Sequence, residues 1–304
     1  MYEPLIAMAE AYYFKNSTTM CTTLLDKCYK TTLTESAVRR MTHMLSCNTN
    51  IIEDKYHHKW DTGGEYWLKY HECLLDKDYD KEFCDRFLSD RCKEAKFKVI
   101  KTPRLSTQIL KTLLQGHSNV TIVHVFRDPR GILFQIMSEN SDQAPVSALR
   151  KYANSLCSRM RDDLEVGFKL ASLYPKRFKL MLFEDFEWDM VTVFKPLFRF
   201  VGFPLYRKDK SFVEAISQKK ALTEYIKETG NKTRPDSSQQ EVLKMTNINP
   251  FQWRKQIDVN NLKIIDEYCG DLYIKLGYNV YANVENLRNL SDWSSYGADG
   301  VYPL

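Results

Sequence analysis

Residues 120–131 read Val-Thr-Ile-Val-His-Val-Phe-Arg-Asp-Pro-Arg-Gly, and this stretch decides the fold class. Its first seven residues form a nearly continuous apolar, β-branched run, which is typical of a strand buried on both faces of a parallel sheet. Asp128 is then a good helix N-cap, and Pro129 suits the first helical position. The stretch therefore predicts a strand that turns directly into a helix N-terminus at the carboxyl edge of a sheet.

Strands and helices are expected to alternate around this stretch. Short apolar runs at 98–100 and 178–183 predict two more strands. Apolar residues at three- and four-residue steps predict a long helix over 145–173, and shorter helices are expected over 191–201 and 262–276, each of which stops at a glycine. This alternation predicts an α/β fold with a parallel central sheet flanked by helices.

The composition excludes several classes of protein. The 304 residues are 43% hydrophobic and include only 11 Gly and 10 Pro, so collagen-like, low-complexity and mostly disordered chains are excluded. The net charge of +5 comes from interleaved acidic and basic residues, which favours an anionic small substrate or polyanion over a nucleic acid partner. No run of about 18 apolar residues predicts a transmembrane helix, and no signal peptide is visible at the start.

The first third of the chain is rich in cysteine. An even number of cysteines, eight in all, is typical of a disulfide framework in an oxidising compartment. A zinc site is the alternative, because His57, His58 and His71 lie nearby, but the paired C-x2-C spacing of zinc sites is missing. Short helices are expected near 1–14 and 33–45, and the rest of this third is predicted to be loop-rich and held by cross-links. Six of the eight cysteines lie in this first third: Cys21, Cys28, Cys47, Cys73, Cys84 and Cys92.

Two cysteines lie outside that cluster. Cys157 falls on the long predicted helix and Cys269 on the last one, so a bridge between them would join the two helices. Two buried free thiols are the alternative.

Glycosylation sequons, each weak alone, favour a location in the secretory lumen, as the cysteine count does. They begin at Asn16, Asn119, Asn231 and Asn289.

Two arginines flank the strand-to-helix turn. Backbone N–H groups and the positive end of a helix face the carboxyl edge of such a sheet, where ligands of open α/β sheets bind. Because guanidinium groups hold phosphate oxygens bidentately, Arg127 and Arg130 predict a phosphate site. The alternative is an Arg–Asp pair that only fixes the loop.

Several segments along the chain resemble the Golgi carbohydrate sulfotransferases of the keratan and chondroitin group, which place sulfate on a sugar 6-hydroxyl. The resemblance covers nearly the whole chain in order. Its segments are 2–5, 99–104, 126–133, Cys157, 183–186, 200–204, 253–254, Cys269 and 276–281.

The resemblance implies a sheet fold related to P-loop kinases, a sulfotransferase domain over 1–285 with a Cys-rich insertion at about 46–95, and a peripheral tail at 286–304. It implies 3′-phosphoadenosine 5′-phosphosulfate (PAPS) as the sulfate donor, with no metal, and a glycan or proteoglycan acceptor. The implied location is the Golgi lumen, with a membrane anchor in a full-length form.

Site residues also follow from the resemblance. Arg127 and a residue eight positions later hold the 3′-phosphate of the donor; that residue is Ser in the family and Gln135 here. The turn's second arginine, Arg130, and Arg254 are further candidates for contact with the nucleotide, although the Trp-Arg piece that contains Arg254 could equally belong to the core. Glu3, in the Glu-Pro piece, is the implied catalytic base for the acceptor hydroxyl.

The family's glycine-rich loop for the 5′-phosphosulfate is missing. Gly63 and Gly64 follow no predicted strand, and no Walker motif occurs, which disfavours a P-loop kinase. We expect that the chain is truncated at its N-terminus, with a degenerate paralogue as the second possibility, and that it is a poor catalyst as it stands. The alternative to an enzyme is an inactive sulfotransferase-like luminal protein that binds glycan or nucleotide.

Overall fold

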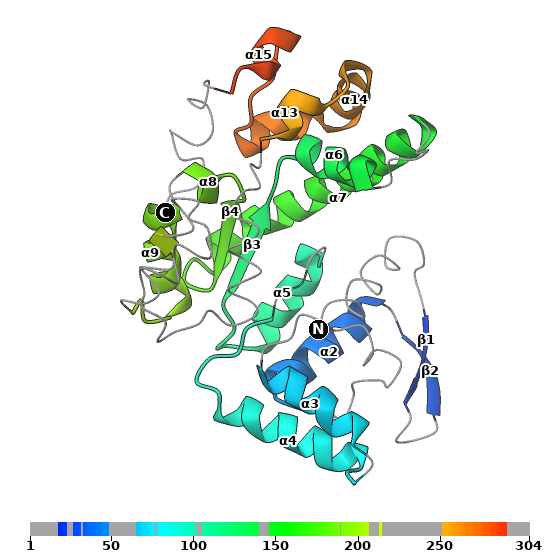
Figure 1. Ribbon diagram of the computed structural model, residues 1–304, viewed down its shortest axis with the longest axis vertical. Helices are drawn as coiled ribbons and strands as arrows, with labels where there is room; N and C mark the ends of the chain where they lie inside the picture. Colours follow the sequence, from blue (N-terminus) through cyan, green and yellow to red (C-terminus); the bar gives the residue numbers. More distant parts are fainter. Residues whose placement is uncertain are drawn as a thin grey trace. The chain divides into compact units, whose positions relative to one another are not determined.

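The chain divides into two compact units, residues 1–120 and 121–304 (Figure 1). In the computed structural model, the residues described are 18–22, 27–31, 33–48, 65–76, 78–100, 102, 105–139, 146–188, 190–206, 213–214 and 251–290. Glu3 and the helix expected near 1–14 lie outside these residues.

The first unit combines a hairpin with helices. Strands β1 (Thr18–Thr22) and β2 (Lys27–Thr31) pair antiparallel. They are followed by α2 (Leu33–Leu45), which confirms the helix predicted there. Among the described residues, this unit also contains the helices α3 (Glu65–Leu75), α4 (Lys81–Glu94) and α5 (Thr107–Gly116).

The described part of the Cys-rich region is mostly helical, where a loop-rich segment was predicted. Helices α3 and α4 are joined by the disulfide Cys73–Cys84, and Cys47–Cys92 ties α4 to the chain just after α2. Tyr70 and Cys84 are fully buried at the centre of this cluster. The buried positions are filled largely by cysteine and tyrosine. The repeat of aliphatic residues that predicts a helix from sequence is therefore weak. The preference for disulfides over zinc is confirmed for these four cysteines.

The strand predicted at 98–100 does not form. These residues lie in neither a helix nor a strand, and Val99 is 71% exposed. Two apolar residues between lysines, Val99 and Ile100, bury too little surface to hold a strand by themselves.

The second unit is built on a parallel pair of strands. Strand β3 (Ile122–Phe126) lies beside β4 (Phe178–Leu182), with Ile122 opposite Phe178, and both strands were predicted. The expected burial on both faces holds for most of β4 but not for β3, where Val125 is 43% exposed. The described part of the chain is therefore a helix-rich α/β fold with a small parallel sheet.

Helices connect and cover the two strands of this sheet. After β3 come α6 (Pro129–Glu139) and α7 (Val146–Leu173), which is the long helix predicted over 145–173. After β4 come α8 (Asp185–Trp188) and α9 (Met190–Val201), and later α13 (Trp253–Gln256), α14 (Val259–Leu276) and α15 (Val284–Arg288). Gly202 and Gly277 follow α9 and α14 with φ of 73° and 75°, which confirms the predicted stop signals.

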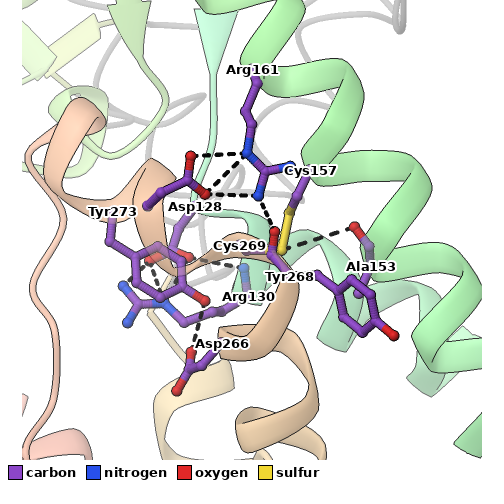
Figure 2. Close-up of a disulfide and its surroundings, with 10 residues drawn as sticks. Asp128, Arg130, Ala153, Cys157, Arg161, Asp266, Tyr268, Cys269 and Tyr273 are labelled. Atoms are coloured by element: carbon purple, nitrogen blue, oxygen red, sulfur yellow. Dashed lines mark hydrogen bonds and ion pairs between the residues drawn. A yellow bond between two sulfur atoms is a disulfide. The ribbon is translucent and has the colours of Figure 1, made fainter.

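Helices α7 and α14 are fastened together (Figure 2). The predicted disulfide between Cys157 and Cys269 is present, with a Cα–Cα distance of 5.3 Å, so the free-thiol alternative is wrong. One turn further along α7, Arg161 donates to both carboxylate oxygens of Asp271 and to the carbonyl of Tyr268. This double attachment holds α14, and the segment that follows it, against the sheet-covering helix α7.

No helix in the described ranges is both long enough and apolar enough to cross a membrane.

Candidate functional site

The candidate site begins where β3 turns into α6. Asp128 accepts a hydrogen bond from the backbone N–H of Arg130 at 2.9 Å, so its side chain caps the start of the helix as predicted. The neighbouring strand β4 ends at the same edge of the sheet, where Phe183 donates its N–H to the carbonyl of Phe126 at 2.7 Å. Parallel pairing therefore brings residues 127–128 and 183–184 together at the carboxyl edge.

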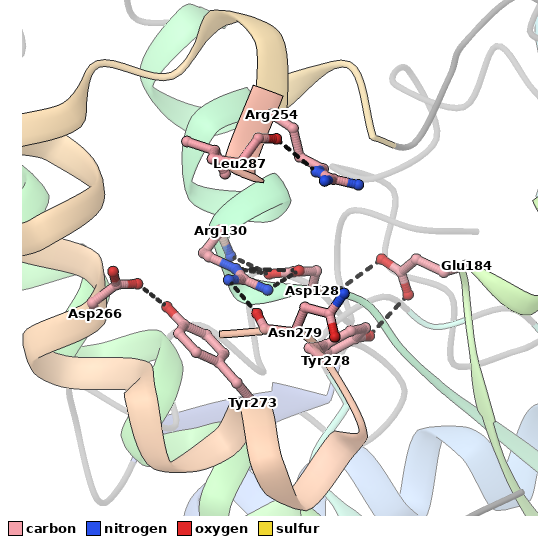
Figure 3. Close-up of polar contacts among 9 residues, drawn as sticks. All are labelled: Asp128, Arg130, Glu184, Arg254, Asp266, Tyr273, Tyr278, Asn279 and Leu287. Carbon is pink, nitrogen blue, oxygen red and sulfur yellow. Dashed lines mark hydrogen bonds and ion pairs between the residues drawn. The ribbon is translucent and has the colours of Figure 1, made fainter. Parts of the chain in front are cut away.

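Arg130 points into the core rather than toward the edge of the sheet (Figure 3). Its side chain is 2% exposed, and its Nη2 lies 2.8 Å from Oδ2 of Asp128. Its Nη1 donates to the carbonyl of Asn279 at 2.8 Å, and its guanidinium lies 4.0 Å from the centre of the Tyr273 ring. The Tyr273 hydroxyl in turn donates to Asp266. Arg130 thus takes the loop-fixing arrangement that was the alternative to phosphate binding.

Arg127 faces the other way and meets Gln135. Nη1 of Arg127 donates to Oε1 of Gln135 at 2.9 Å, two helical turns along α6. The Arg127 guanidinium also lies 5.1 Å from the centre of the Phe183 ring at the end of β4. The structure therefore brings together the two residues that the resemblance assigned to the 3′-phosphate, in an exposed contact.

Gly131 leaves room for an indole beside Arg127. A Cβ on Gly131 would lie 3.0 Å from Cδ1 and 3.2 Å from Nε1 of Trp253, and 3.7 Å from Nε of Arg127. Both nitrogens are buried, and neither has a hydrogen-bond partner among the described residues. Buried N–H groups are normally paired, so two unpaired donors at a helix N-terminus are a feature that an anionic ligand fits.

Arg254 is fully buried and holds the C-terminal part of this unit. It anchors α15 by donating to three backbone carbonyls, those of Leu287, Asn289 and Asn286, at 3.0, 2.7 and 3.2 Å. These hydrogen bonds hold the Arg254 guanidinium to the backbone of α15 and the residue after it. Its Nη1 has no hydrogen-bond partner in the described ranges, and its contact with the nucleotide stays a prediction. Leu287, at the start of the expected tail, is fully buried.

Glu184 is a site residue that the sequence reasoning did not single out. It is 2% exposed, and its Oε1 accepts from the N–H of Asp128 at 3.0 Å while its Oε2 accepts from the hydroxyl of Tyr278 at 2.8 Å. Burial, and then the negative charge of Asp128, raise the pKa of Glu184 to about 7. A carboxylate directly after an apolar strand, beside another strand that ends in Asp, was the available signal.

The described residues contain no group of three or more His, Cys, Asp or Glu side chains placed to hold a metal ion.

The fold and the site together are those of an α/β protein with a candidate site for a phosphorylated ligand. An arginine, unpaired N–H donors and a helix N-terminus gather at the carboxyl edge of a parallel strand pair, which is where α/β proteins bind phosphorylated ligands.

Comparison with known proteins finds distant relatives that share one activity in their names. Carbohydrate sulfotransferase 1 of Danio rerio is 20% identical over 219 residues, which are 67% of this chain and 49% of the relative. Carbohydrate sulfotransferase 5 of Mus musculus is 23% identical over 69% of this chain and 53% of the relative. Carbohydrate sulfotransferase 3 of Tetronarce californica is 22% identical over 66% of this chain and 46% of the relative.

The chain is similar to carbohydrate sulfotransferases over about two thirds of its length, which supports the resemblance read from its motifs without indicating a particular member. It spans about half the length of the curated relatives it matches. No family model matches the chain.

Proposed function

We propose that this protein transfers sulfate from PAPS to the 6-hydroxyl of a sugar residue in a glycan or glycosaminoglycan. The matched relatives are carbohydrate sulfotransferases, which supports a sulfated sugar as the product. The observation that carries the proposal is the pairing of Arg127 with Gln135 at the start of α6. In the proposal, this pair holds the 3′-phosphate of the donor nucleotide.

The chemistry of these side chains suits a phosphate. A guanidinium can donate two parallel hydrogen bonds to phosphate oxygens. Gln135 carries a donor nitrogen as well as the oxygen that accepts from Arg127, so its amide can hold Arg127 in place and donate to the ligand. The unpaired N–H groups of Arg127 and Trp253 lie on the same side of the helix start. Arg130 would not touch the nucleotide and would instead fix the turn that carries Arg127.

The rest of the reaction follows the family resemblance. PAPS supplies the activated sulfuryl group, in a sheet fold related to P-loop kinases. Glu3 is the proposed base that accepts the proton of the sugar hydroxyl. The Golgi lumen is the proposed location, which the disulfides Cys47–Cys92, Cys73–Cys84 and Cys157–Cys269 support, since such bonds persist in oxidising compartments.

Titration calorimetry with 3′-phosphoadenosine 5′-phosphate tests the binding step. Charge-assisted hydrogen bonds contribute about 1.5–3 kcal/mol each, so Arg127→Ala should weaken binding roughly ten- to a hundredfold. Arg150→Ala is the matched control, because it removes an exposed arginine that pairs with Glu267 on α14. Gln135→Ser should bind equally or more tightly, since it releases Arg127. Equal affinity of the Arg127→Ala variant and the unmodified protein would contradict the proposed site.

An activity assay tests the transfer step separately. Radiolabelled sulfate from PAPS is offered with keratan, chondroitin and N-acetylglucosamine-terminated acceptors, and the products are mapped for 6-O-sulfate. Label at another hydroxyl would contradict the 6-hydroxyl assignment, and nucleotide binding without transfer to any acceptor would favour a binding protein.

A further inference from the structure

We propose that Glu184 is a positioning residue that holds the Arg127 turn in its nucleotide-binding geometry, and that it does so only as a carboxylate. This inference rests on the proposed function, because it concerns the same phosphate site.

Glu184 joins three segments that are far apart in sequence (Figure 3). It lies directly after β4, and it accepts the N–H of Asp128, which is 56 positions earlier at the end of β3. It also accepts the hydroxyl of Tyr278, which is 94 positions later and just beyond α14. The N–H of Tyr278 donates to the carbonyl of Tyr273 in the C-terminal cap of α14. Glu184 is thus a common anchor for the turn, for the sheet edge and for the segment after α14.

The backbone group that Glu184 holds belongs to the residue next to Arg127. A hydrogen bond to the N–H of Asp128 restrains the peptide plane between residues 127 and 128, and with it the direction in which the Arg127 side chain leaves the chain. Asp128 is fixed from the other side by Arg130. The turn is therefore clamped between a carboxylate that binds its backbone and a guanidinium that binds its side chain.

Both oxygens of Glu184 act as acceptors, and the charged form accepts both hydrogen bonds more strongly than the protonated form. A protonated carboxyl carries its own O–H donor and keeps less acceptor capacity. The carboxylate of Asp128 already accepts from the N–H, Nε and Nη2 of Arg130 and offers little to a new donor. Protonation of Glu184 would therefore weaken one of its two hydrogen bonds.

The charged and titratable groups around Glu184 are few in the described part of the chain. From the β3 turn, Asp128 faces it, with Arg130 behind; from the segment after α14, the Tyr278 hydroxyl faces it. Asp266 and Tyr273, on α14, lie on the far side of Arg130. Burial and the charge of Asp128 raise the pKa of Glu184 to about 7, while the hydrogen bond from Tyr278 lowers it. The anchor should therefore titrate near neutral pH.

The test compares the affinity for 3′-phosphoadenosine 5′-phosphate of the unmodified protein and Glu184→Gln between pH 6 and 8.5. The second ionisation of the phosphate itself affects both proteins equally and cancels in the ratio of affinities. At pH 8.5, Glu184→Gln should bind about three- to tenfold more weakly, as expected for one lost hydrogen bond. At pH 6 the two affinities should converge. Glu165→Gln, an exposed carboxylate on α7 paired with Lys169, is the control and should show no such change.

A ratio that stays constant across this pH range would overturn the proposal, even if binding is weaker throughout, because a purely structural residue predicts that result. Tyr278→Phe supplies a second variant. It removes the hydrogen bond that lowers the pKa of Glu184, so the pH midpoint of binding should move upward. A midpoint that is unchanged or lower would count against the anchor.

Amide hydrogen exchange separates this inference from the proposed function. Without any nucleotide, Glu184→Gln should raise the exchange rate of the backbone amides of Arg127, Asp128 and Arg130 relative to the Glu165→Gln control at pH 8. Faster exchange in a protein that binds no nucleotide would overturn the proposed function and keep the positioning role. Unchanged exchange in a protein that does bind would overturn the positioning role alone.

Discussion

Glu184 and His124 should both make the free energy of unfolding depend on pH. Their contributions change with pH in opposite directions and therefore largely cancel. His124 lies on β3, its ring centre is 4.6 Å from that of Phe126, and its Nδ1 is buried without a hydrogen-bond partner in the described part of the chain. Burial lowers the pKa of His124 to about 4, whereas burial and Asp128 raise the pKa of Glu184 to about 7. Each residue is thus uncharged over much of the acidic range in the folded protein.

The contribution of Glu184 is greatest at low pH. Its pKa rises from an ordinary value of 4.5 to about 7 on folding, so the folded protein holds the proton more tightly than the unfolded chain. The stabilisation is fully present below pH 4.5 and is lost as the pH rises through 7. A change of one pKa unit corresponds to about 1.4 kcal/mol, so the loss amounts to about 3 kcal/mol.

The contribution of His124 has the opposite sign. Its pKa falls from an ordinary value of 6.5 to about 4 on folding, so the unfolded chain binds the proton more tightly. This stabilisation is fully present above pH 6.5 and is lost as the pH falls through 4. The size is again about 3 kcal/mol. Between pH 4.5 and 6.5 the two slopes oppose each other, so the unmodified protein should change little in stability because of this pair.

Two substitutions allow the pH dependence of the unfolding free energy that each residue contributes to be measured separately. Glu184→Gln leaves His124 unopposed, so this variant should lose about 3 kcal/mol as the pH falls from 6.5 toward 4. His124→Phe keeps an aromatic ring beside Phe126 and leaves Glu184 unopposed, so this variant should lose a similar amount as the pH rises from 4.5 to 7. Urea unfolding with the disulfides intact measures both. If both variants show the same pH dependence as the unmodified protein, the reasoning is refuted.

Two further predictions concern the core. Replacing Cys157 and Cys269 by serine opens a loop with a sequence separation of 112, and the chain-entropy model puts the loss at about 4–5 kcal/mol of unfolding free energy, measured in urea; a loss below about 1 kcal/mol would contradict it. Gly131→Ala places a Cβ 3.0 Å from Trp253, so it should cost about 1–3 kcal/mol and shift the tryptophan fluorescence. Gly270→Ala on α14, where a Cβ meets nothing within 4 Å, is the control and should stabilise the helix by about 0.5–1 kcal/mol; a loss of stability there as large as at Gly131 would contradict the packing argument.

The sequence by itself determined what depends on local spacing. The apolar run before Arg127 and the Asp128-Pro129 pair predicted the strand, the turn and the helix start, because these patterns act within a few residues. The family resemblance assigned Arg127 and Gln135 to one phosphate, and the structure brings these two side chains into contact. The bridge from Cys157 to Cys269 followed from two well-marked helices and the scarcity of other partners.

Only the tertiary structure decided what each polar side chain of the turn contacts. Arg127 and Arg130 look equivalent in the sequence, yet one lies at the exposed edge and the other is buried among Asp128, Asn279 and Tyr273, because residues nearly 150 positions later return to cover it. Arg254 likewise could not be assigned from its neighbours, since its partners are carbonyls of α15. A buried charge needs a partner wherever the chain supplies one, and the supply is set by how distant segments pack rather than by spacing along the chain.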